Sequence, residues 1–386
     1  MIQIFFYASR NCAKLFNISV KKFGNQFSPN NVSIFSKVIV TLGNQTITCR
    51  AAIAWAANST LSIEEVQVEP PKAGEVRIKM ASTGICGTDD NAIKGLISAV
   101  FPFIPGHEGA GIVESIGKGV SSVKPGDKVL ALAIPQCREC SSCLHPKGNF
   151  CEKQETSRFT CEGKKIHHSF RTSTFTEYSV VPEIAVAKID GAAPMDKVGV
   201  ISCEVPTGYG AAVNSAKVTR GSTCMVYGLG GIGSAIVMGC KASGASRIIG
   251  VDINEKKFPR ARALGVTDCL NPRKLGADFA FEAIGLSDVM LAAWDSCHLS
   301  HGVCLIVGLA PLNSKLSLDA SVIISRRTLK GVCLGDYKTR DCIPQLVTGY
   351  LQNKINIDPL VTHQLPFDQL HKLSRCTMLE KRECFI

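Results

Sequence analysis

The chain has no acidic residue before Glu64, and it has no dense basic run after residue 40. The 386-residue chain has a formal net charge of +11, but residues 1–40 carry five Lys or Arg and no acid. The other positive charges are spread out, so the sequence predicts a modest attraction for anionic cofactors and no nucleic-acid partner. No basic segment precedes the run at residues 2–8, which argues against a secretory signal.

Residues 1–42 are interpreted as an N-terminal extension, disordered or resembling a transit peptide. A basic, acid-free segment is typical of mitochondrial transit peptides, and an extension with no targeting role is the alternative. The 18 cysteines, without a secretory signal, favour a reducing compartment in which thiols stay free or bind metal. We therefore expect a cytoplasmic protein, or a mitochondrial one if residues 1–40 act as a transit peptide.

One uncharged segment, Gly221 to Cys240, is long enough to cross a membrane. Four glycines are grouped in its middle and would break a membrane helix. A buried strand, a glycine turn and a helix explain the segment better, so no membrane partner is predicted.

The same segment carries a dinucleotide-binding pattern. Residues 223–227 predict a parallel strand that is apolar on both faces, and residues 234–242 predict a helix. Between them lies a turn that contains the glycines Gly228, Gly230 and Gly233. Such glycines let the backbone approach a pyrophosphate at the N-terminus of the helix.

Asp252 ends a second predicted strand, residues 247–251, nineteen residues past Gly233. A carboxylate at this place accepts hydrogen bonds from a ribose and would repel a 2′-phosphate, so NAD is favoured over NADP. Lys257 is a further candidate for contact with this ribose, and an exposed helix lysine is the alternative.

Four cysteines lie within fifteen residues at the spacing Cys-x2-Cys-x2-Cys-x7-Cys, and they are Cys137, Cys140, Cys143 and Cys151. This density of thiols is typical of a closed, tetrahedral, structural Zn²⁺ site. Core cysteines or two disulfides are the alternative.

A second, dispersed set of candidate metal ligands consists of Cys86, His107 and Cys203. Two thiolates and one imidazole leave a fourth position on Zn²⁺ for water or substrate, which is typical of a catalytic site. Taken without the other motifs, these three residues would be interpreted as ordinary buried side chains.

The combination of motifs resembles the medium-chain, zinc-containing alcohol dehydrogenases, most closely the mammalian class V enzymes. The resemblance covers residues 43 to 367 and rests on residues 84–89, 106–117, 173–175 and 207–210, the four-cysteine loop and the glycine turn. The ligand set of two Cys and one His is the established catalytic zinc set of these enzymes, so it is carried here by resemblance.

The resemblance implies an α/β fold with a GroES-like, β-rich catalytic domain and a doubly wound Rossmann coenzyme domain. It places the first part of the catalytic domain, with both zinc sites, at residues 43–204. The NAD-binding domain follows at residues 205–333, and the return segment of the catalytic domain at residues 334–386. Two domains agree with the chain length, and the family implies a homodimer.

The resemblance also implies an activity: NAD-dependent oxidation of primary or secondary alcohols, aliphatic alcohols or retinol, to aldehydes or ketones, with two Zn²⁺ per chain. Asp89 resembles the carboxylate that fixes the tautomer of the metal ligand His107, and Thr88 resembles the hydroxyl that takes the alcohol proton. Glu108 would approach the metal from behind, with a structural role as the alternative, and Thr207 would pack near the nicotinamide.

Several residues depart from the family. Gly87 stands where many relatives have an arginine against the pyrophosphate, and Glu204 and Pro206 stand where the family has small residues. Residues 271–277 form a short link between two predicted parallel strands, whose crossover usually needs a dozen residues or more. A catalytically impaired or inactive zinc-binding splice product of the same family is therefore the alternative function.

Overall fold

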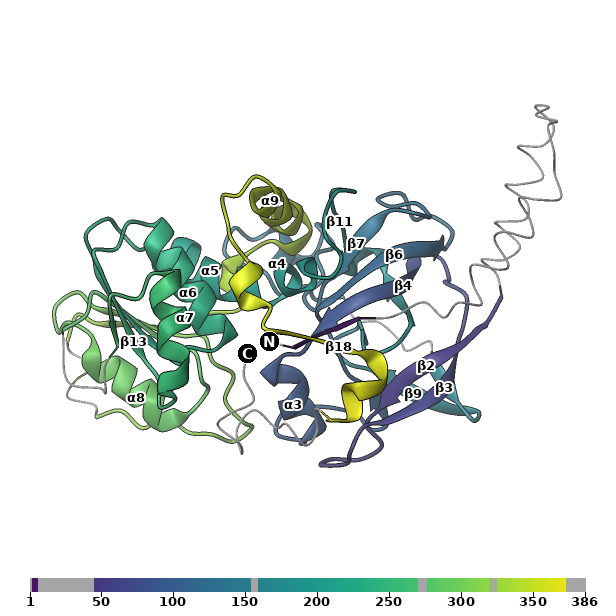
Figure 1. Cartoon of the computed structure of the whole chain (residues 1–386), viewed down its shortest axis with the longest axis horizontal. Helices are drawn as coiled ribbons and strands as arrows, with labels where there is room; N and C mark the ends of the chain where they lie inside the picture. Colours follow the sequence, from purple (N-terminus) through teal and green to yellow (C-terminus); the bar gives the residue numbers. More distant parts are fainter. Residues whose placement is uncertain are drawn as a thin grey trace.

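The computed structural model describes residues 2–5, 45–153, 159–269, 276–319, 322 and 325–372, without the side chains of residues 2–5, 371 and 372. Two bodies lie side by side along the long axis (Figure 1): one is rich in antiparallel strands, and the other is built around a parallel sheet. The chain begins in the first body, forms the second, and returns to the first in its last described residues.

The larger sheet of the β-rich body is seven-stranded and mainly antiparallel. In spatial order it consists of β11 (Val186–Lys188), β7 (Lys128–Ala131), β6 (Gly109–Ile116), β4 (Glu75–Gly84), β1 (Ile2–Phe5) and β18 (His363–Pro366), with β10 (Tyr178–Pro182) also paired to β4. Buried aliphatic side chains of β4, such as Val76 and Ile78, pack against Val113 of β6 and form one core cluster.

The antiparallel pairing of β4 with β6 positions the residues that follow and precede these strands. Thr83 pairs with Gly109, and the N–H of Gly84 donates to the carbonyl of Glu108 at 3.0 Å. The first turn after β4 therefore lies beside the last residues before β6.

A second, five-stranded sheet packs in the same body. Its spatial order is β2 (Ile47–Ile53), β3 (Ser62–Val68), β8 (Phe159–Cys161), β9 (Lys164–His168) and β5 (Phe103–Ile104). A core that includes Phe103, Phe159 and Phe175 also contains Cys49 and residues 51–53 of β2, and Val66 and Val68 of β3.

The parallel sheet of the second body is six-stranded. Its spatial order is β14 (Asp268–Cys269), β13 (Arg247–Val251), β12 (Thr223–Tyr227), β15 (Phe279–Glu282), β16 (Val303–Ile306) and β17 (Thr328–Gly331), and all neighbours are parallel. The bounds of β12 and β13 are those predicted from the apolar runs.

Helices cover both faces of this sheet. One core joins Val226 of β12 to α6 (Gly231–Ala242) and α7 (Phe258–Leu264). The other joins Met225, the next residue of β12, to α8 (Ser287–Ser296). Since neighbouring residues of one strand face opposite layers, the sheet is doubly wound, which confirms the predicted fold class.

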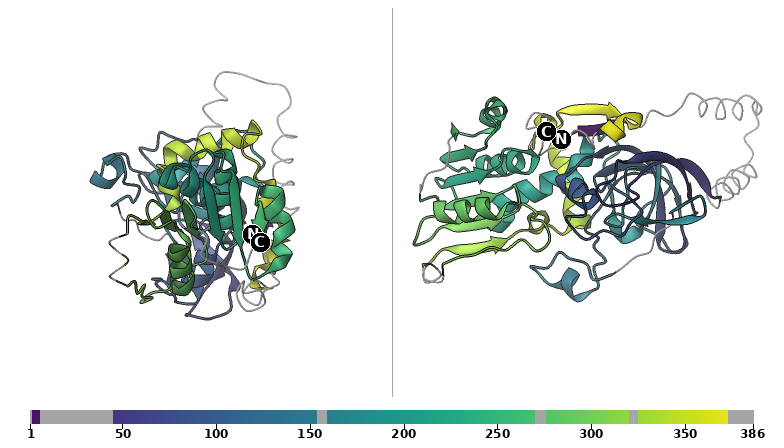
Figure 2. Two further views of the ribbon diagram at one scale, coloured as in Figure 1. Left: turned by 90° about the vertical axis from the view of Figure 1, so that its left-hand side faces the viewer. Right: turned by 90° about the horizontal axis from the view of Figure 1, so that it is seen from below.

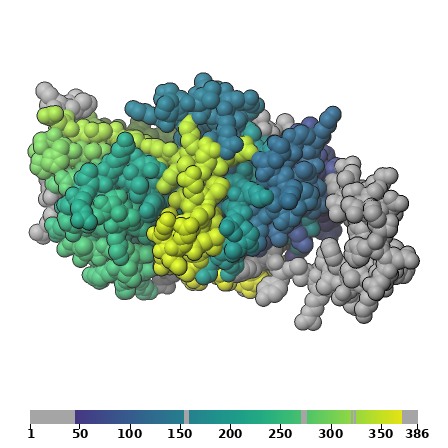
Figure 3. Space-filling model, turned by 90° about the horizontal axis from the view of Figure 1, so that it is seen from above, coloured from purple at the N-terminus to yellow at the C-terminus, as the bar shows by residue number. Residues whose placement is uncertain are grey.

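The remaining helices are α3 (Gly87–Ile93), α4 (Ser141–Leu144), α5 (Glu204–Gly210) and α9 (Thr339–Leu351). A core cluster spans the junction of the two bodies and includes Leu130 of β7, Val205 of α5, Ala235 of α6 and Ile343 of α9. Seen from above, α9 and the residues after it lie across this junction (Figure 3). Within the part of the chain that the structure describes, none of the helices has the length and apolarity needed to span a bilayer.

The first strand, β1, pairs in parallel with β18 and antiparallel with β4, and Figure 2 shows it in purple beside the yellow β18. The other residues of the predicted extension up to residue 42 lie outside the described residues, so that domain boundary stays a prediction. Most of the predicted short crossover, residues 271–277, also lies outside them. The strands that it connects, β14 and β15, are three places apart in the sheet.

Candidate functional site

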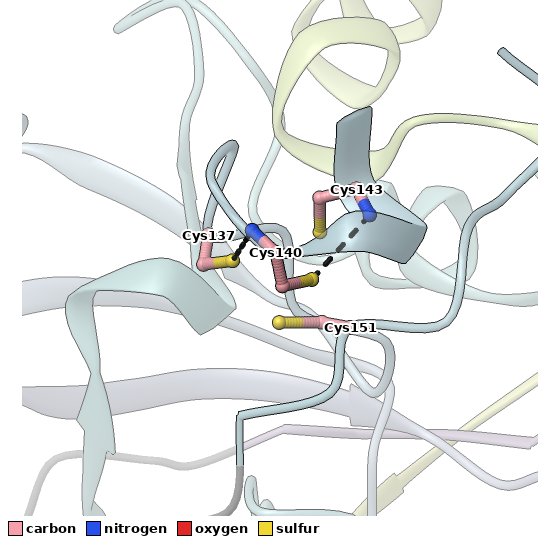
Figure 4. Close-up of side chains that lie close together, drawn as sticks. All are labelled: Cys137, Cys140, Cys143 and Cys151. Atoms are coloured by element: carbon pink, nitrogen blue, oxygen red, sulfur yellow. Dashed lines mark hydrogen bonds between the residues drawn. The ribbon is translucent and has the colours of Figure 1, made fainter. Parts of the chain in front are cut away.

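The four closely spaced cysteines converge in the loop that carries α4, as Figure 4 shows for Cys137, Cys140, Cys143 and Cys151. Their sulfur atoms all lie within 4.8 Å of one another, and all four are free thiols. Backbone donors point at two of the sulfurs: Cys140 N–H donates to Cys137 Sγ at 3.3 Å, and Cys143 N–H donates to Cys140 Sγ at 3.4 Å. The geometry fits one tetrahedral all-thiolate Zn²⁺ with no position left for a substrate.

This loop is tied to the return segment of the chain. The ammonium of Lys338, the residue before α9, donates to the carbonyls of Cys143 at 2.6 Å and His145 at 2.8 Å. The backbone of Glu152, and then that of Cys143, hydrogen-bonds the Cys140 sulfur and lowers the pKa of this thiol to about 6. One ligand is therefore a thiolate near neutral pH before any metal binds, since thiolate is the form that coordinates.

The dispersed ligands meet at the start of two helices. Cys86 precedes α3, Cys203 precedes α5, and His107 lies just before β6. Their ligand atoms, together with a carboxylate oxygen of Glu108, all lie within 4.8 Å of one another. The β4–β6 pairing brings Cys86 to His107. Cys203 reaches the same place from the start of α5, at the junction between the two bodies.

Glu108 supplies an independent sign that a cation belongs here. Its side chain is fully buried, and neither carboxylate oxygen has a hydrogen-bond partner in the described residues. Burial raises the pKa of Glu108 well above its usual value. A carboxyl group buried without partners is costly unless a cation or a proton compensates it, so the two sulfurs and one imidazole beside this carboxyl group fit Zn²⁺.

Asp89 orients the imidazole. Its Oδ1 lies 2.9 Å from His107 Nδ1 and accepts from the N–H of Gly106 at 3.0 Å, and its side chain is about 99% buried. Because Nδ1 is engaged by the carboxylate, Nε2 is left to face the sulfurs. Thr88 lies at the rim of the cluster, where its Oγ1 is 3.5 Å from Cys86 Sγ.

The thiols of Cys86 and Cys203 are joined by a hydrogen bond. A hydrogen bond with Cys203 holds the pKa of Cys86 well below its usual value, and the same bond raises the pKa of Cys203. Burial alone would lower the pKa of His107, but the Asp89 carboxylate and the Cys86 thiol together outweigh burial and raise that pKa. Metal binding displaces such protons, so the affinity of this cluster for a cation must depend on pH.

The glycine turn, residues 228–233, connects β12 to α6 as expected, although the helix begins at Gly231 rather than at residue 234. Gly228 has φ of +90°, which favours glycine. A Cβ on Gly233 would lie 1.7 Å from the Gly228 carbonyl oxygen, so only glycine permits the close packing of turn and helix. Gly230 is the N-cap residue of α6.

Asp252, at the end of β13, supports this turn. Its carboxylate accepts from the N–H of Leu229 at 2.8 Å and from the N–H of Asn254 at 2.8 Å. Lys257 lies 2.9 Å away and forms an ion pair with it. The structure therefore brings the two candidate ribose contacts together at the carboxyl end of the parallel strands, where open α/β sheets bind ligands.

Three further residues lie near the metal cluster or the glycine turn. Thr207 lies on α5, one turn after Cys203, to whose carbonyl its N–H donates at 3.0 Å. Glu204 is buried beside the turn, and burial raises its pKa to about 7. Arg260 of α7, which sequence reasoning missed, donates to Ser234 Oγ at 3.2 Å. No local motif marks Arg260, because only the packing of α7 on α6 places it there.

Two family descriptions match the chain: the alcohol dehydrogenase GroES-like domain over residues 72–191, and the zinc-binding dehydrogenase over residues 231–348. A solved alcohol dehydrogenase zinc-binding domain protein from Burkholderia ambifaria is 30% identical, with a TM-score of 0.78 and coverage of 86% of this chain and 96% of that chain. Benzyl alcohol dehydrogenase from Acinetobacter calcoaceticus is 27% identical, with a TM-score of 0.78 and coverage of 87% and 97%.

A third solved structure, CAD from Helicobacter pylori in complex with NADP(H), is 24% identical. Its TM-score is 0.67, and the match covers 81% of this chain and 90% of that chain. At this identity the similarity concerns the fold alone.

Proposed function

The chain belongs to the medium-chain zinc alcohol dehydrogenase family, and on that premise we propose that it oxidises primary or secondary alcohols to aldehydes or ketones with NAD. The observation that carries this proposal is the meeting of Cys86, His107 and Cys203, with Glu108, within 4.8 Å of one another. When bound, Zn²⁺ supplies polarisation of the alcohol oxygen, and the nicotinamide supplies the hydride acceptor.

The chain's own residues hold the ligands and move the proton. Asp89 keeps the His107 imidazole in the tautomer that leaves Nε2 free to coordinate. The Thr88 hydroxyl is beside Cys86 Sγ at 3.5 Å, where it takes the proton of the alcohol and passes it to solvent. Thr207 lies one turn beyond Cys203, where it would pack near the nicotinamide.

NAD is the proposed coenzyme because Asp252 lies at the end of β13 with Lys257 as its partner. A 2′-phosphate at this place would meet a carboxylate that already supports the glycine turn through the Leu229 N–H. This like-charge contact disfavours NADP.

Aliphatic alcohols and retinol are the proposed substrates, through the resemblance to the mammalian class V enzymes. Two Zn²⁺ per chain, one in the four-cysteine loop and one in the dispersed cluster, and a homodimer are proposed on the same basis. The proposed location is the cytoplasm, or the mitochondrion if residues 1–40 act as a transit peptide.

A second candidate is a zinc protein of the same family with little or no dehydrogenase activity. One observation favours it: the buried Glu204 lies against the glycine turn, where the family has a small residue. Such a protein would keep the zinc of the four-cysteine loop but hold the metal of the dispersed cluster and NAD poorly.

The test combines metal analysis with coenzyme binding and turnover on the purified full chain. The proposed function predicts two zinc ions per chain, a rise in Tm on adding NAD, and NAD reduction with ethanol or retinol. A matched variant, Cys203→Ser, should lose one zinc ion and all turnover while it keeps the zinc of the four-cysteine loop. One zinc ion in the unaltered chain, with no NAD-dependent change in Tm, would instead support the second candidate.

A further inference from the structure

The close crossing of α5 and α6 determines which side chain lies at the N-terminus of α6, the helix that follows the glycine turn. Gly208 of α5 is in close contact with the first turn of α6: a Cβ on it would lie 2.4 Å from the Ile232 carbonyl oxygen and 2.6 Å from Ala235 Cβ. Glu204 is four residues earlier and therefore on the same face of α5. Its side chain is directed at the N-terminus of α6.

The carboxyl group of Glu204 lies directly on the glycine turn. A Cβ on Gly231, the first residue of α6, would be 2.2 Å from Glu204 Oε2 and 2.5 Å from Oε1. Glu204 is only 3% exposed, and its Oε1 has no hydrogen-bond partner in the part of the chain that the structure describes. A polar atom that is buried without a partner at this place points to a ligand or to competition with one.

The space beside Gly231 is the place at which glycine turns of this type bind an anion. The glycines leave room for a pyrophosphate, whose oxygens accept from the N–H groups at the helix N-terminus, and the helix dipole favours negative charge there. In this chain a side-chain carboxyl group already lies in that space. Its size opposes a phosphate, and so does its negative charge when the carboxyl group is ionised.

We propose that Glu204 is an internal competitor for the dinucleotide pyrophosphate and limits the affinity of this chain for its coenzyme. Binding of the dinucleotide requires the Glu204 side chain to leave the N-terminus of α6. Among the described residues, Arg260 attracts the Glu204 carboxylate, and its guanidinium donates to Ser234 Oγ of α6 at 3.2 Å. The inference rests on the proposed function only in requiring that the chain binds a dinucleotide.

The experiment measures the Kd of NADH by fluorescence titration for the zinc-loaded full chain and for two variants. Glu204→Ala removes both bulk and charge, and it should tighten NADH about tenfold or more, which corresponds to about 1.4 kcal/mol. Glu204→Gln keeps the bulk and removes the charge, so it should tighten NADH by a smaller factor. Glu75→Gln, which changes a buried carboxylate of β4 far from the turn, is the control and should leave the Kd unchanged.

Two ligand fragments separate competition at the pyrophosphate from a general change of the site. ADP-ribose carries the pyrophosphate and should gain affinity in the same order as NADH, whereas adenosine carries no phosphate and should not. Zinc content and Tm of each variant are measured in parallel, because Glu204 is next to Cys203. An unchanged or weaker NADH Kd in Glu204→Ala, or an equal gain for adenosine, would overturn the inference.

Turnover is scored separately from binding, so the two proposals fail in different ways. A Glu204→Ala variant that binds NADH tightly but oxidises no alcohol would remove the proposed function and leave this inference standing. Alcohol oxidation together with NADH Kd values that do not change when Glu204 is replaced would support the proposed function and overturn this inference.

Discussion

Replacing Asp89 by Asn tests the metal cluster through the residue that orients its imidazole. Asp89 is about 99% buried, and its Oδ1 lies 2.9 Å from His107 Nδ1 and 3.0 Å from the Gly106 nitrogen. An asparagine oxygen is able to accept both hydrogen bonds but carries no charge. The variant therefore removes the negative charge that strengthens both hydrogen bonds and keeps the shape of the side chain.

The magnitude follows from these two bonds. A hydrogen bond to a charged group contributes about 1.5–3 kcal/mol and a neutral one about 0.5–1.5 kcal/mol, so two bonds lose roughly 2–3 kcal/mol in total. This corresponds to about a 30- to 150-fold loss of zinc affinity, and it agrees with the 10- to 100-fold loss that is typical when a partner of a metal-bound histidine is changed. The new amide also directs an N–H₂ group at the Cys86 N–H, from which Asp89 Oδ2 lies 3.4 Å away, and two donors repel.

The assay is zinc release to a graded series of chelators, followed by metal analysis of the protein. The four-cysteine loop is an internal reference, because Asp89 contributes nothing to its geometry. We expect the dispersed site to lose zinc at a much lower chelator concentration than in the unaltered chain, and the reference site to be unaffected. Equal retention at both sites, or an equal loss from both, would refute the assignment of Asp89 to the cluster of Cys86, His107 and Cys203.

Three further changes have definite expected outcomes. Gly87→Arg should tighten NADH by about 1.5–3 kcal/mol through a charge-assisted bond to the pyrophosphate; a Cβ on Gly87 meets nothing within 4 Å, and an unchanged Kd in a fluorescence titration would contradict this. Cys140→Ser should lower bound zinc by one ion per chain and lower Tm by at least about 5 °C, since its loop is anchored to Lys338; retention of both ions would argue against a zinc-holding loop. Glu114→Gln should lower the free energy of unfolding in urea by about 3 kcal/mol, because it removes the negative charge 2.6 Å from the fully buried Arg77 guanidinium; a loss below about 1 kcal/mol would contradict this.

Local patterns predicted the coenzyme domain well. The apolar runs at residues 223–227 and 247–251 became β12 and β13 with the predicted bounds, and the glycines between them form the turn. These elements are determined within a few residues, since a strand buried on both faces must be continuously apolar and a tight turn must contain glycine. Only the start of α6 differed, because Gly231 and Ile232 already have helical backbone.

The two candidate metal sites differ in how far the sequence alone predicts them. The four cysteines lie in one short loop, so their spacing alone indicates a common site. Cys86, His107 and Cys203 were assigned through the resemblance to a family, because no local pattern connects residues so far apart in the chain. The β4–β6 pairing and the start of α5 bring them together, and neither can be read from the three residues themselves.

The sequence by itself determined the glycine turn and the cysteine loop, since each depends on residues that are neighbours along the chain, whereas the fold class was inferred through the resemblance to a family. The tertiary structure decided which side chain lies against the N-terminus of α6. Glu204 stood out in the sequence only as a carboxyl group where relatives have a small residue. Its contact with Gly231 arises because Gly208 lets α5 approach α6 closely, and helix crossings depend on the packing of both surfaces at once.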